Sequence, residues 1–330
     1  MNNEYLRSAF AGSILKMTER SDIHKNLQSS IFNLQYFFRR FRENNVDLII
    51  PILNSLNYIL VLIMVAMGLV IIFGLMRVIN MAHGEFFLIG AYTVVMTEQL
   101  GWGFWAGLIL SPIVVGLFGM IIEYLFIRHL YRRFLDTILA TWGLSIAIKQ
   151  LVIIIFGPEG LMVRPPLPQS IHLGALEYPA YRLFIMGVAV IVIFVTFFIF
   201  FRTDFGLGAR SVIANRDMAA ALGINTRRMY RTTFTFGSAL AGLAGAVMAP
   251  LMSCDPQMGL GFFIPAFLSI LVGGAGTLAG ILVGGAVVGG SDSIISFLFS
   301  PVTAQIVVFS LAIVLIRFRP QGLIGTKRRG

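Results

Sequence analysis

The sequence contains few charged residues and a single cysteine. Of its 330 residues, 12% are charged and 57% are apolar, and the mean hydropathy is +0.86. A soluble protein needs more charged residues to cover its core, so this composition excludes an ordinary soluble globular protein. Cys254 has no second cysteine with which to form an intramolecular disulfide. Residues 1–20 lack the apolar run of a cleavable signal peptide, so we expect the transmembrane helices to direct insertion.

The sequence also lacks the motifs of several enzyme classes. It has no His-Glu-x-x-His motif, and its four histidines are widely separated, which argues against metal catalysis. It has no Gly-Lys dipeptide and therefore no P-loop for nucleotide hydrolysis. Asp255 and Asp292 each lie at the end of an apolar block, where an aspartate is usually solvated, so we expect no catalytic carboxylate pair. The sequence thus predicts no catalytic residue, no metal site and no cofactor.

Apolar residues instead fall in long blocks. About 20 residues carry a helix across a hydrocarbon layer of about 30 Å. No alternation of period two is sustained, as a transmembrane barrel would require. We therefore predict an all-α, polytopic membrane protein with about eight transmembrane helices. The apolar stretches are 48–76, 86–97, 104–122, 137–157, 183–201, 232–254, 262–291 and 293–316.

Basic residues cluster beside these stretches. The net charge is +10, and 21 of the 25 Lys and Arg residues lie in four clusters. Basic loops remain on the cytoplasmic side of a membrane, so the pattern indicates membrane lipid rather than nucleic acid as a partner. The loop 202–231 is therefore predicted to be cytoplasmic, whereas the proline-rich segment 158–182 is predicted to be non-helical and external. The four clusters are 1–42, 128–133, 202–231 and 317–329.

Residues 1–46 form a polar, basic N-terminal extension that precedes a transmembrane domain at 47–330. Within it, residues 31–41 either form a basic, aromatic helix on the membrane surface or belong to a disordered tail. The basic-loop rule places the extension inside the cell. Counting crossings back from the loop 202–231 makes the stretch 48–76 run inward and places the extension outside. An additional crossing or a re-entrant turn before residue 86 would reconcile the two.

Small residues in the C-terminal half indicate close helix packing. The 36 uncharged residues between Asp255 and Asp292 contain a glycine cluster at 273–276, which predicts two short helices or a hairpin dipping into the membrane. Glycine or alanine also recurs four residues apart, as in Gly237 and Ala241 or Gly280 and Gly284. This spacing lets helix backbones approach closely, either within this subunit or against a second membrane subunit.

A first polar island runs from Arg77 to Glu85 between two apolar stretches, and it includes Asn80 and His83. Ionisable groups at membrane depth usually line a path or a substrate cavity. Gly84 within the island is consistent with a locally unwound helix. The alternative is an ordinary polar turn at the membrane surface, with Asn80 as a helix cap.

A second polar island lies in the loop 202–231. Its centre, from Asp217 to Leu222, is rich in alanine and favours a short helix. Gly223 stands where a helix commonly ends. A compact helix on a basic cytoplasmic loop is typical of a docking element, and the alternative is a loop helix that rests on lipid headgroups.

These islands resemble a known family. The run Ile79-Asn80-Met81-Ala82-His83-Gly84-Glu85, with Gly74-Leu75-Met76 before it and Gly90-Ala91-Tyr92 after it, resembles the signature of ABC importer permeases for branched-chain amino acids, urea and short amides. Asp217-Met218-Ala219-x-x-x-Gly223 is similar to the Glu-Ala-Ala-x-x-x-Gly coupling pattern of ABC permeases. The segments Leu139-Ala140-Thr141-Trp142-Gly143-Leu144-Ser145 and Arg319-Pro320-Gln321-Gly322 resemble the urea and amide branch more than the amino-acid branch.

The resemblance runs from about residue 50 to the C-terminus and implies a permease subunit of an ABC importer. Such a subunit forms half of the path for a small polar solute across a bacterial inner membrane. Its expected partners are a second permease, two ATPase subunits and an extracytoplasmic substrate-binding protein. The resemblance assigns ATPase coupling to Arg216, Asp217, Ala219, Gly223, Ile224 and Asn225, and the translocation path to Asn80, His83, Glu85, Trp142 and Ser145.

Two features depart from the family. Arg77 stands where relatives mostly carry a small residue, and the extension 1–46 has no recognised counterpart. An alternative function of another class is an ion-coupled secondary transporter, in which Arg77, His83 and Glu85 would form the coupling site.

Overall fold

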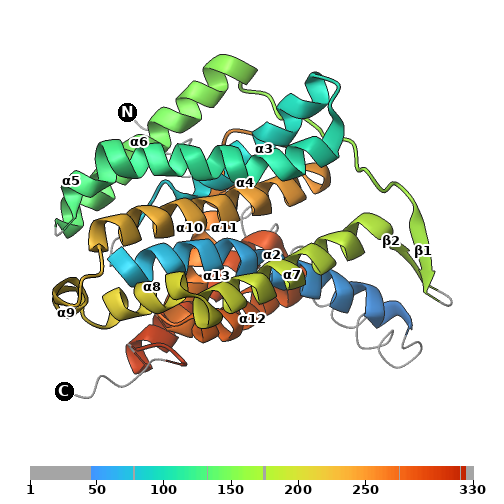
Figure 1. The fold of residues 1–330 in the computed structure, drawn as a ribbon. Helices are drawn as coiled ribbons and strands as arrows, with labels where there is room; N and C mark the ends of the chain where they lie inside the picture. Colours follow the sequence, from blue (N-terminus) through green and yellow to red (C-terminus); the bar gives the residue numbers. More distant parts are fainter. Residues whose placement is uncertain are drawn as a thin grey trace, which may run out of the picture.

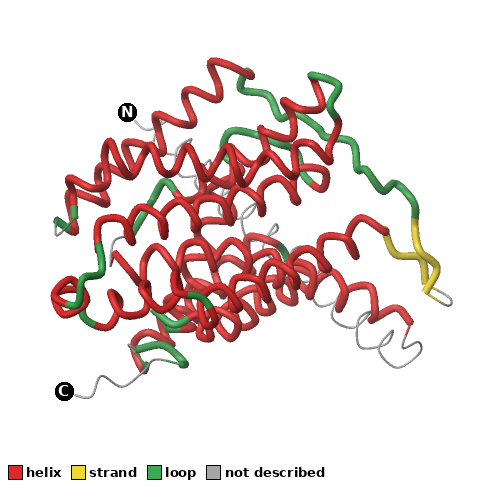
Figure 2. The backbone as a smooth tube through the Cα atoms, viewed as in Figure 1, coloured by secondary structure: helices red, strands yellow, loops and turns green. Residues whose placement is uncertain are grey.

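A computed structural model describes residues 46–324 apart from 77–78, 132, 174–175, 275 and 320. These residues form a bundle of helices and one antiparallel hairpin, in which Ser170 pairs with Pro179 (Figures 1 and 2). The predicted all-α, polytopic architecture is confirmed. The elements are α2 (Val46–Met76), α3 (His83–Gln99), α4 (Gly103–Ile122), η1 (Glu123–Ile127), α5 (Arg128–Leu130), α6 (Phe134–Phe156), β1 (Ser170–Leu173), β2 (Leu176–Pro179), α7 (Ala180–Arg202), α8 (Asp204–Ala214), α9 (Arg216–Ala221), α10 (Thr226–Met248), η2 (Ala249–Leu251), α11 (Met258–Gly273), α12 (Leu278–Leu298) and α13 (Pro301–Phe318).

Seven helical spans in this part of the chain are long and apolar enough to cross a membrane. They contain α2, α4, α6, α7, α10, α12 and α13. Two further bundle helices are shorter, since α3 has 17 residues and α11 has 16. The described helices therefore agree with the prediction of about eight. Arg77 and the extension, except for its last residue Val46, lie outside the described residues.

Helix α2 is the centre of the bundle. Its sequence is apolar on every side, as expected for a helix that other helices surround. Residues 61–67 are all buried. Helices α7, α10, α11 and α12 all contact α2. The position of α2 therefore fixes where these four helices can lie.

Glycines allow the neighbouring helices to reach α2 and one another. A Cβ atom added to Gly237 of α10 would lie 2.7 Å from the backbone oxygen of Gly68 in α2. A Cβ at Gly285 of α12 would lie 2.5 Å from Ile63 in α2, and one at Gly284 would collide with the backbone oxygen of Ser269 in α11. Atoms cannot approach this closely, so only glycine fits. The small-residue pattern thus serves packing within this subunit.

The hairpin and the short helix α9 lie at opposite ends of the bundle (Figure 1). The first turns of α2 lie at the hairpin end, because Tyr178 of β2 donates to Asn54 Oδ1 at 3.1 Å and Asn57 donates to the backbone oxygen of Arg182 at 2.9 Å. Helix α2 is continuous from Val46 to Met76. The additional crossing that would move the extension to the other side is therefore not found within residues 46–76.

The chain turns back into the bundle before α3. His83, the first residue of α3, contacts the backbone oxygen of Val65 through Nε2 at 3.2 Å. Val65 precedes the end of α2 by 11 residues, which is about 16 Å along a helix axis. Helix α3 thus begins inside the bundle and not at its end, which explains why it is short.

The segment between Asp255 and Asp292 breaks where its glycines predict. Helix α11 ends at Gly273, and Gly274 has a φ of +116°, a conformation that favours glycine. Only the first of the two helices is short, because α12 continues through Asp292 to Leu298. The predicted boundary at 291–293 is therefore wrong. Asp292 is only partly buried at this point of α12, and Tyr58 of α2 is its hydrogen-bond partner.

The described topology predicts which loops are accessible from each side of the membrane. In a Cys254→Ser background, a cysteine at exposed Ile171 in the hairpin should react with an impermeant thiol reagent in intact cells. A cysteine at exposed Met218 in α9 should react only after the membrane is permeabilised, since the two sites lie at opposite ends of the bundle. The protein with its native, buried Cys254 is the unreactive control. Equal labelling of both cysteines in intact cells would contradict this arrangement.

Candidate functional site

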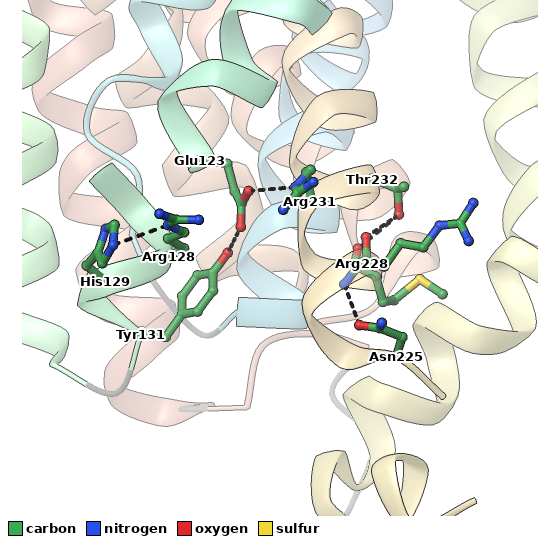
Figure 3. Close-up of polar contacts among 9 residues, drawn as sticks. Glu123, Arg128, His129, Tyr131, Asn225, Arg228, Arg231 and Thr232 are labelled. Carbon is green, nitrogen blue, oxygen red and sulfur yellow. Dashed lines mark hydrogen bonds and ion pairs between the residues drawn. The ribbon is translucent and has the colours of Figure 1, made fainter. Parts of the chain in front are cut away.

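The short helix α9 is held at both ends by its own sequence. At its start, Asn215 Oδ1 accepts a hydrogen bond from the Met218 N–H at 3.0 Å. At its end, Gly223 has a φ of +88°, and its N–H donates to the Ala220 oxygen at 3.0 Å. Asn225 then caps α10 by accepting from the Arg228 N–H at 3.0 Å (Figure 3). A Cβ at Gly223 would meet nothing within 4 Å, so its constraint is backbone conformation and not space.

The predicted coupling residues have different positions on this helix. Ala219 is buried, and Ile224 packs against the core, so both hold α9 on the bundle. Arg216 lies over the Tyr230 ring with its guanidinium carbon 5.3 Å from the ring centroid. Asp217 lies in the first turn of α9, where a negative charge is favourable.

Two exposed apolar residues, Met218 in α9 and Leu222 directly after it, are not among the coupling residues assigned from the resemblance. The exposed fractions are 62% for Met218 and 77% for Leu222. They are four residues apart and therefore share one face of the helix. In the sequence, two apolar residues in a short loop helix were the signal from which a protein contact could have been predicted. The structure shows that both side chains are exposed, as such a contact requires.

A basic cavity of about 420 Å³ lies beside α9. Arg128, Arg216 and Arg227 line it together with His129 and two tyrosines, and no carboxylate is among its lining residues. The rings of Tyr131 and Tyr230 lie 4.9 Å apart and form one wall. Its chemistry suits an anionic group, since arginine binds carboxylate and phosphate through paired hydrogen bonds.

Glu123 is fully buried and links two segments of the chain at this end of the bundle (Figure 3). Tyr131 donates to Glu123 Oε1 at 2.5 Å, and Arg231 Nε of α10 lies 3.5 Å from Glu123 Oε2. The residue lies in η1, the π-helical continuation of α4. A single acidic residue directly after a long apolar stretch was the available sequence signal, but its partner is more than 100 residues away. Glu123 therefore connects α4 to the helix that follows α9.

The first polar island lies inside the bundle and not in a surface turn. The exposed fractions of Asn80, His83 and Glu85 are 1%, 0% and 2%. Asn80 Oδ1 accepts a hydrogen bond from the Ala82 N–H at 3.1 Å and closes the turn before α3. Gly84 allows the start of α3 to touch α11, since a Cβ there would lie 2.5 Å from the Gly259 oxygen.

Helix α6 supplies partners for this island. Ser145 donates to Glu85 Oε1 at 2.8 Å, and Lys149 Nζ lies 3.5 Å from the same oxygen. Thr141 accepts from the Met81 N–H at 3.1 Å. Lys149 and Thr141 were not among the path residues assigned from the resemblance, although a lysine inside an apolar stretch is itself a signal. The structure thus brings Ser145 to Glu85.

Trp142 does not join these residues. It is 56% exposed, on the outer face of α6. That face carries further exposed apolar side chains, among them Leu139 and Ile146. The outer face of α6 is therefore available to lipid or to another membrane subunit.

Three atoms of the island are buried without a hydrogen-bond partner among the described residues. They are Asn80 Nδ2, His83 Nδ1 and Glu85 Oε2. A buried polar group without a partner costs about 1–3 kcal/mol. These atoms supply donor and acceptor capacity that a polar solute or water would satisfy.

Comparison with known proteins identifies relatives along most of the chain. The model of the family described as branched-chain amino acid transport system / permease component matches residues 51–316. The high-affinity branched-chain amino acid transport system permease protein BraD of Pseudomonas aeruginosa is 28% identical over 282 residues, which cover 79% of this chain and 91% of BraD.

Two proteins of Escherichia coli K12 with the corresponding description are also similar. LivH is 27% identical over 278 residues, 79% of this chain and 90% of LivH. LivM is 23% identical over 296 residues, 82% of this chain and 69% of LivM. No solved structure matches the chain.

The buried pair of Glu85 and Lys149 predicts unequal effects of single and double substitutions. Lys149→Met should lower the free energy of unfolding by about 3–5 kcal/mol, because it leaves Glu85 buried without its cation. Adding Glu85→Gln should restore most of that loss. Thermal unfolding in detergent measures both effects, with Gln150→Met at an exposed neighbouring position as the control. If Lys149→Met is as stable as Gln150→Met, the pair does not hold α6 on α3.

Proposed function

Because the chain belongs to the branched-chain amino acid transport permease family, we propose that it carries a branched-chain amino acid across a bacterial inner membrane. It is a multi-pass transport subunit of an ABC importer and not an enzyme. The observation that carries the substrate assignment is the family match over residues 51–316, together with relatives described as branched-chain amino acid permeases. The comparisons give no support to the ion-coupled alternative.

We propose that the chain forms half of the translocation path and that a second permease supplies the other half. Two similar proteins of one organism, LivH and LivM, are both permease proteins of a branched-chain amino acid system, which favours paired permeases. Two ATPase subunits and an extracytoplasmic binding protein complete the proposed assembly. The permease domain is proposed to begin near residue 47, with the extension 1–46 outside it.

The proposed path runs along the start of α3 and the facing side of α6. Asn80, His83, Glu85 and Ser145 place donors and acceptors inside the bundle, which supports this assignment. Trp142 lies on the outer face of α6. We assign it to the side of the path that faces the second permease.

Coupling to the ATPase is proposed at α9. Met218 and Leu222 form an exposed apolar tip, and the basic cavity beside it offers Arg216 to an acidic side chain. Movement of α9 would reach α4 through Arg231 and Glu123, because α10 follows α9 directly. The chain has no P-loop, so ATP hydrolysis is assigned to the partners.

A second candidate substrate class is urea or a short amide. The segment from Leu139 to Ser145 resembles that branch, and Ser145 lies against Glu85 in the proposed path. A neutral amide would use the same hydrogen-bonding groups without needing a charge partner. The two classes are separated by measuring uptake.

Vesicles containing the chain with its partners should take up leucine in an ATP-dependent manner, and valine and isoleucine should compete, whereas urea and acetamide should not. Glu85→Gln should reduce uptake roughly tenfold, since it removes a buried charge from the proposed path. Glu159→Gln, at an exposed position outside the helices, is the matched control. Uptake of urea in place of leucine would transfer the assignment to the amide class. Equal leucine uptake by both variants would remove Glu85 from the path.

The apolar tip of α9 predicts a coupling defect. Leu222→Asp should leave the protein inserted but lower leucine uptake and substrate-stimulated ATP hydrolysis by roughly tenfold or more, because it places a charge in an apolar contact. Leu207→Asp on α8 is the control, since Leu207 is also exposed but lies outside the tip. Normal stimulation in the Leu222 variant would show that the ATPase does not bind this face.

A further inference from the structure

A groove of about 540 Å³ runs along α10, and its lining includes no residue of the proposed path or of α9. Helix α10 forms its floor, and α4 forms one wall through residues from Pro112 to Met120. The other wall is the junction of α7 and α8, with Ile199 and Phe205. The α4 wall is about 12 Å long at 1.5 Å per residue. The floor and both walls belong to or adjoin membrane-spanning helices.

Small residues create this space. A Cβ added to Gly116 of α4 would lie 3.4 Å from the Cβ of Ala239 in α10 and 3.5 Å from the Thr235 oxygen. The two helices therefore touch at the bottom of the groove, and no side chain from either helix fills the volume above this contact. Nearly all of the lining is apolar, as in Ile113, Leu117 and Phe236.

One end of the groove is cationic. Arg231 and Thr232 line it at the second turn of α10, the end nearest α9 (Figure 3). Arg231 is held in place by Glu123 at 3.5 Å and by the Tyr124 ring, whose centroid is 5.2 Å from its guanidinium carbon. Its side chain nevertheless remains 36% exposed. A guanidinium has five N–H donors, so donors remain for a second anion at the groove.

Further basic residues lie near the same end. Arg202 ends α7, and Arg210 of α8 lies over the Phe201 ring at 5.2 Å. Asp204 is the acidic residue in the first turn of α8, between the two. The surroundings of Phe205 thus carry more positive than negative charge. This is the cytoplasmic end of the bundle by the basic-loop rule.

We propose that the groove binds an anionic phospholipid of the cytoplasmic leaflet. One acyl chain lies along Ile113, Leu117 and Ala239, and the phosphate pairs with Arg231. Two features of the groove favour this occupant, namely the change in polarity along its length and the positive charge at one end. It is apolar toward the bilayer centre and cationic at headgroup level, as a phospholipid requires. A transmembrane helix of another subunit would fill the apolar part but would leave the remaining N–H donors of Arg231 without a second acceptor.

Lipid binding by the purified chain tests the proposal independently of transport, so its failure would leave the proposed function untouched. Native mass spectrometry should show retained phosphatidylglycerol in preference to phosphatidylcholine. Ala239→Leu, which fills the groove, and Arg231→Lys, which keeps the charge beside Glu123 but loses the guanidinium fork, should each lower retention roughly tenfold. Val190→Leu on the exposed face of α7 is the control and should retain lipid like the native chain.

Crosslinking locates the lipid. Phosphatidylglycerol with a photoreactive acyl chain should label peptides of α4 and α10 in the native chain and not in Ala239→Leu. Equal retention by Ala239→Leu and Val190→Leu, or equal retention of the two lipids, would overturn the proposal. Labelling that disappears when the second permease is bound would show that the groove is a subunit interface instead.

Discussion

The close approach of α10, α11 and α12 around α2 is the constraint on which the rest of the structure depends. Lipid supplies no hydrophobic force between helices, so contact must come from packing. Gly237 lets α10 reach the backbone of α2, and Gly285 lets α12 pack directly on the Ile63 side chain of α2. The backbone of Gly68 is the surface that α10 meets. This packing fixes the depth of the neighbouring helices and thereby the positions of the buried polar groups that they carry.

One consequence is the depth of α3. Its first residue contacts Val65 well inside α2, and the chain can return this far because Gly84 fits against Gly259. The polar residues near that helix start are thereby buried. Their hydrogen bonds must come from neighbouring helices, and Ser145 and Lys149 of α6 provide them for Glu85. Close packing at the start of α3 thus explains why α6, whose outer face is exposed, is held on the bundle by polar contacts.

The cytoplasmic end joins three features through α10. Its first residues follow the proposed coupling helix α9, Arg231 in its second turn pairs with Glu123, and the same arginine lines the groove proposed to bind lipid. A rigid helix transmits displacement along its length. The ion pair is nearly dry on the Glu123 side, so separating it costs far more than separating a surface pair. We infer that α4 and α10 move together at this end.

The sequence by itself determined the membrane architecture and the form of the loop helix. Long apolar stretches leave few options in lipid, and Asn215, Gly223 and Asn225 act on backbone groups only a few residues away. The tertiary structure alone decided that α12 continues past Asp292, that Lys149 reaches Glu85, and that Trp142 remains exposed on α6. These outcomes depend on contacts between helices far apart in the chain. Local sequence fixes whether a segment is helical, whereas the depth and rotation of that helix follow from the shape of its neighbours.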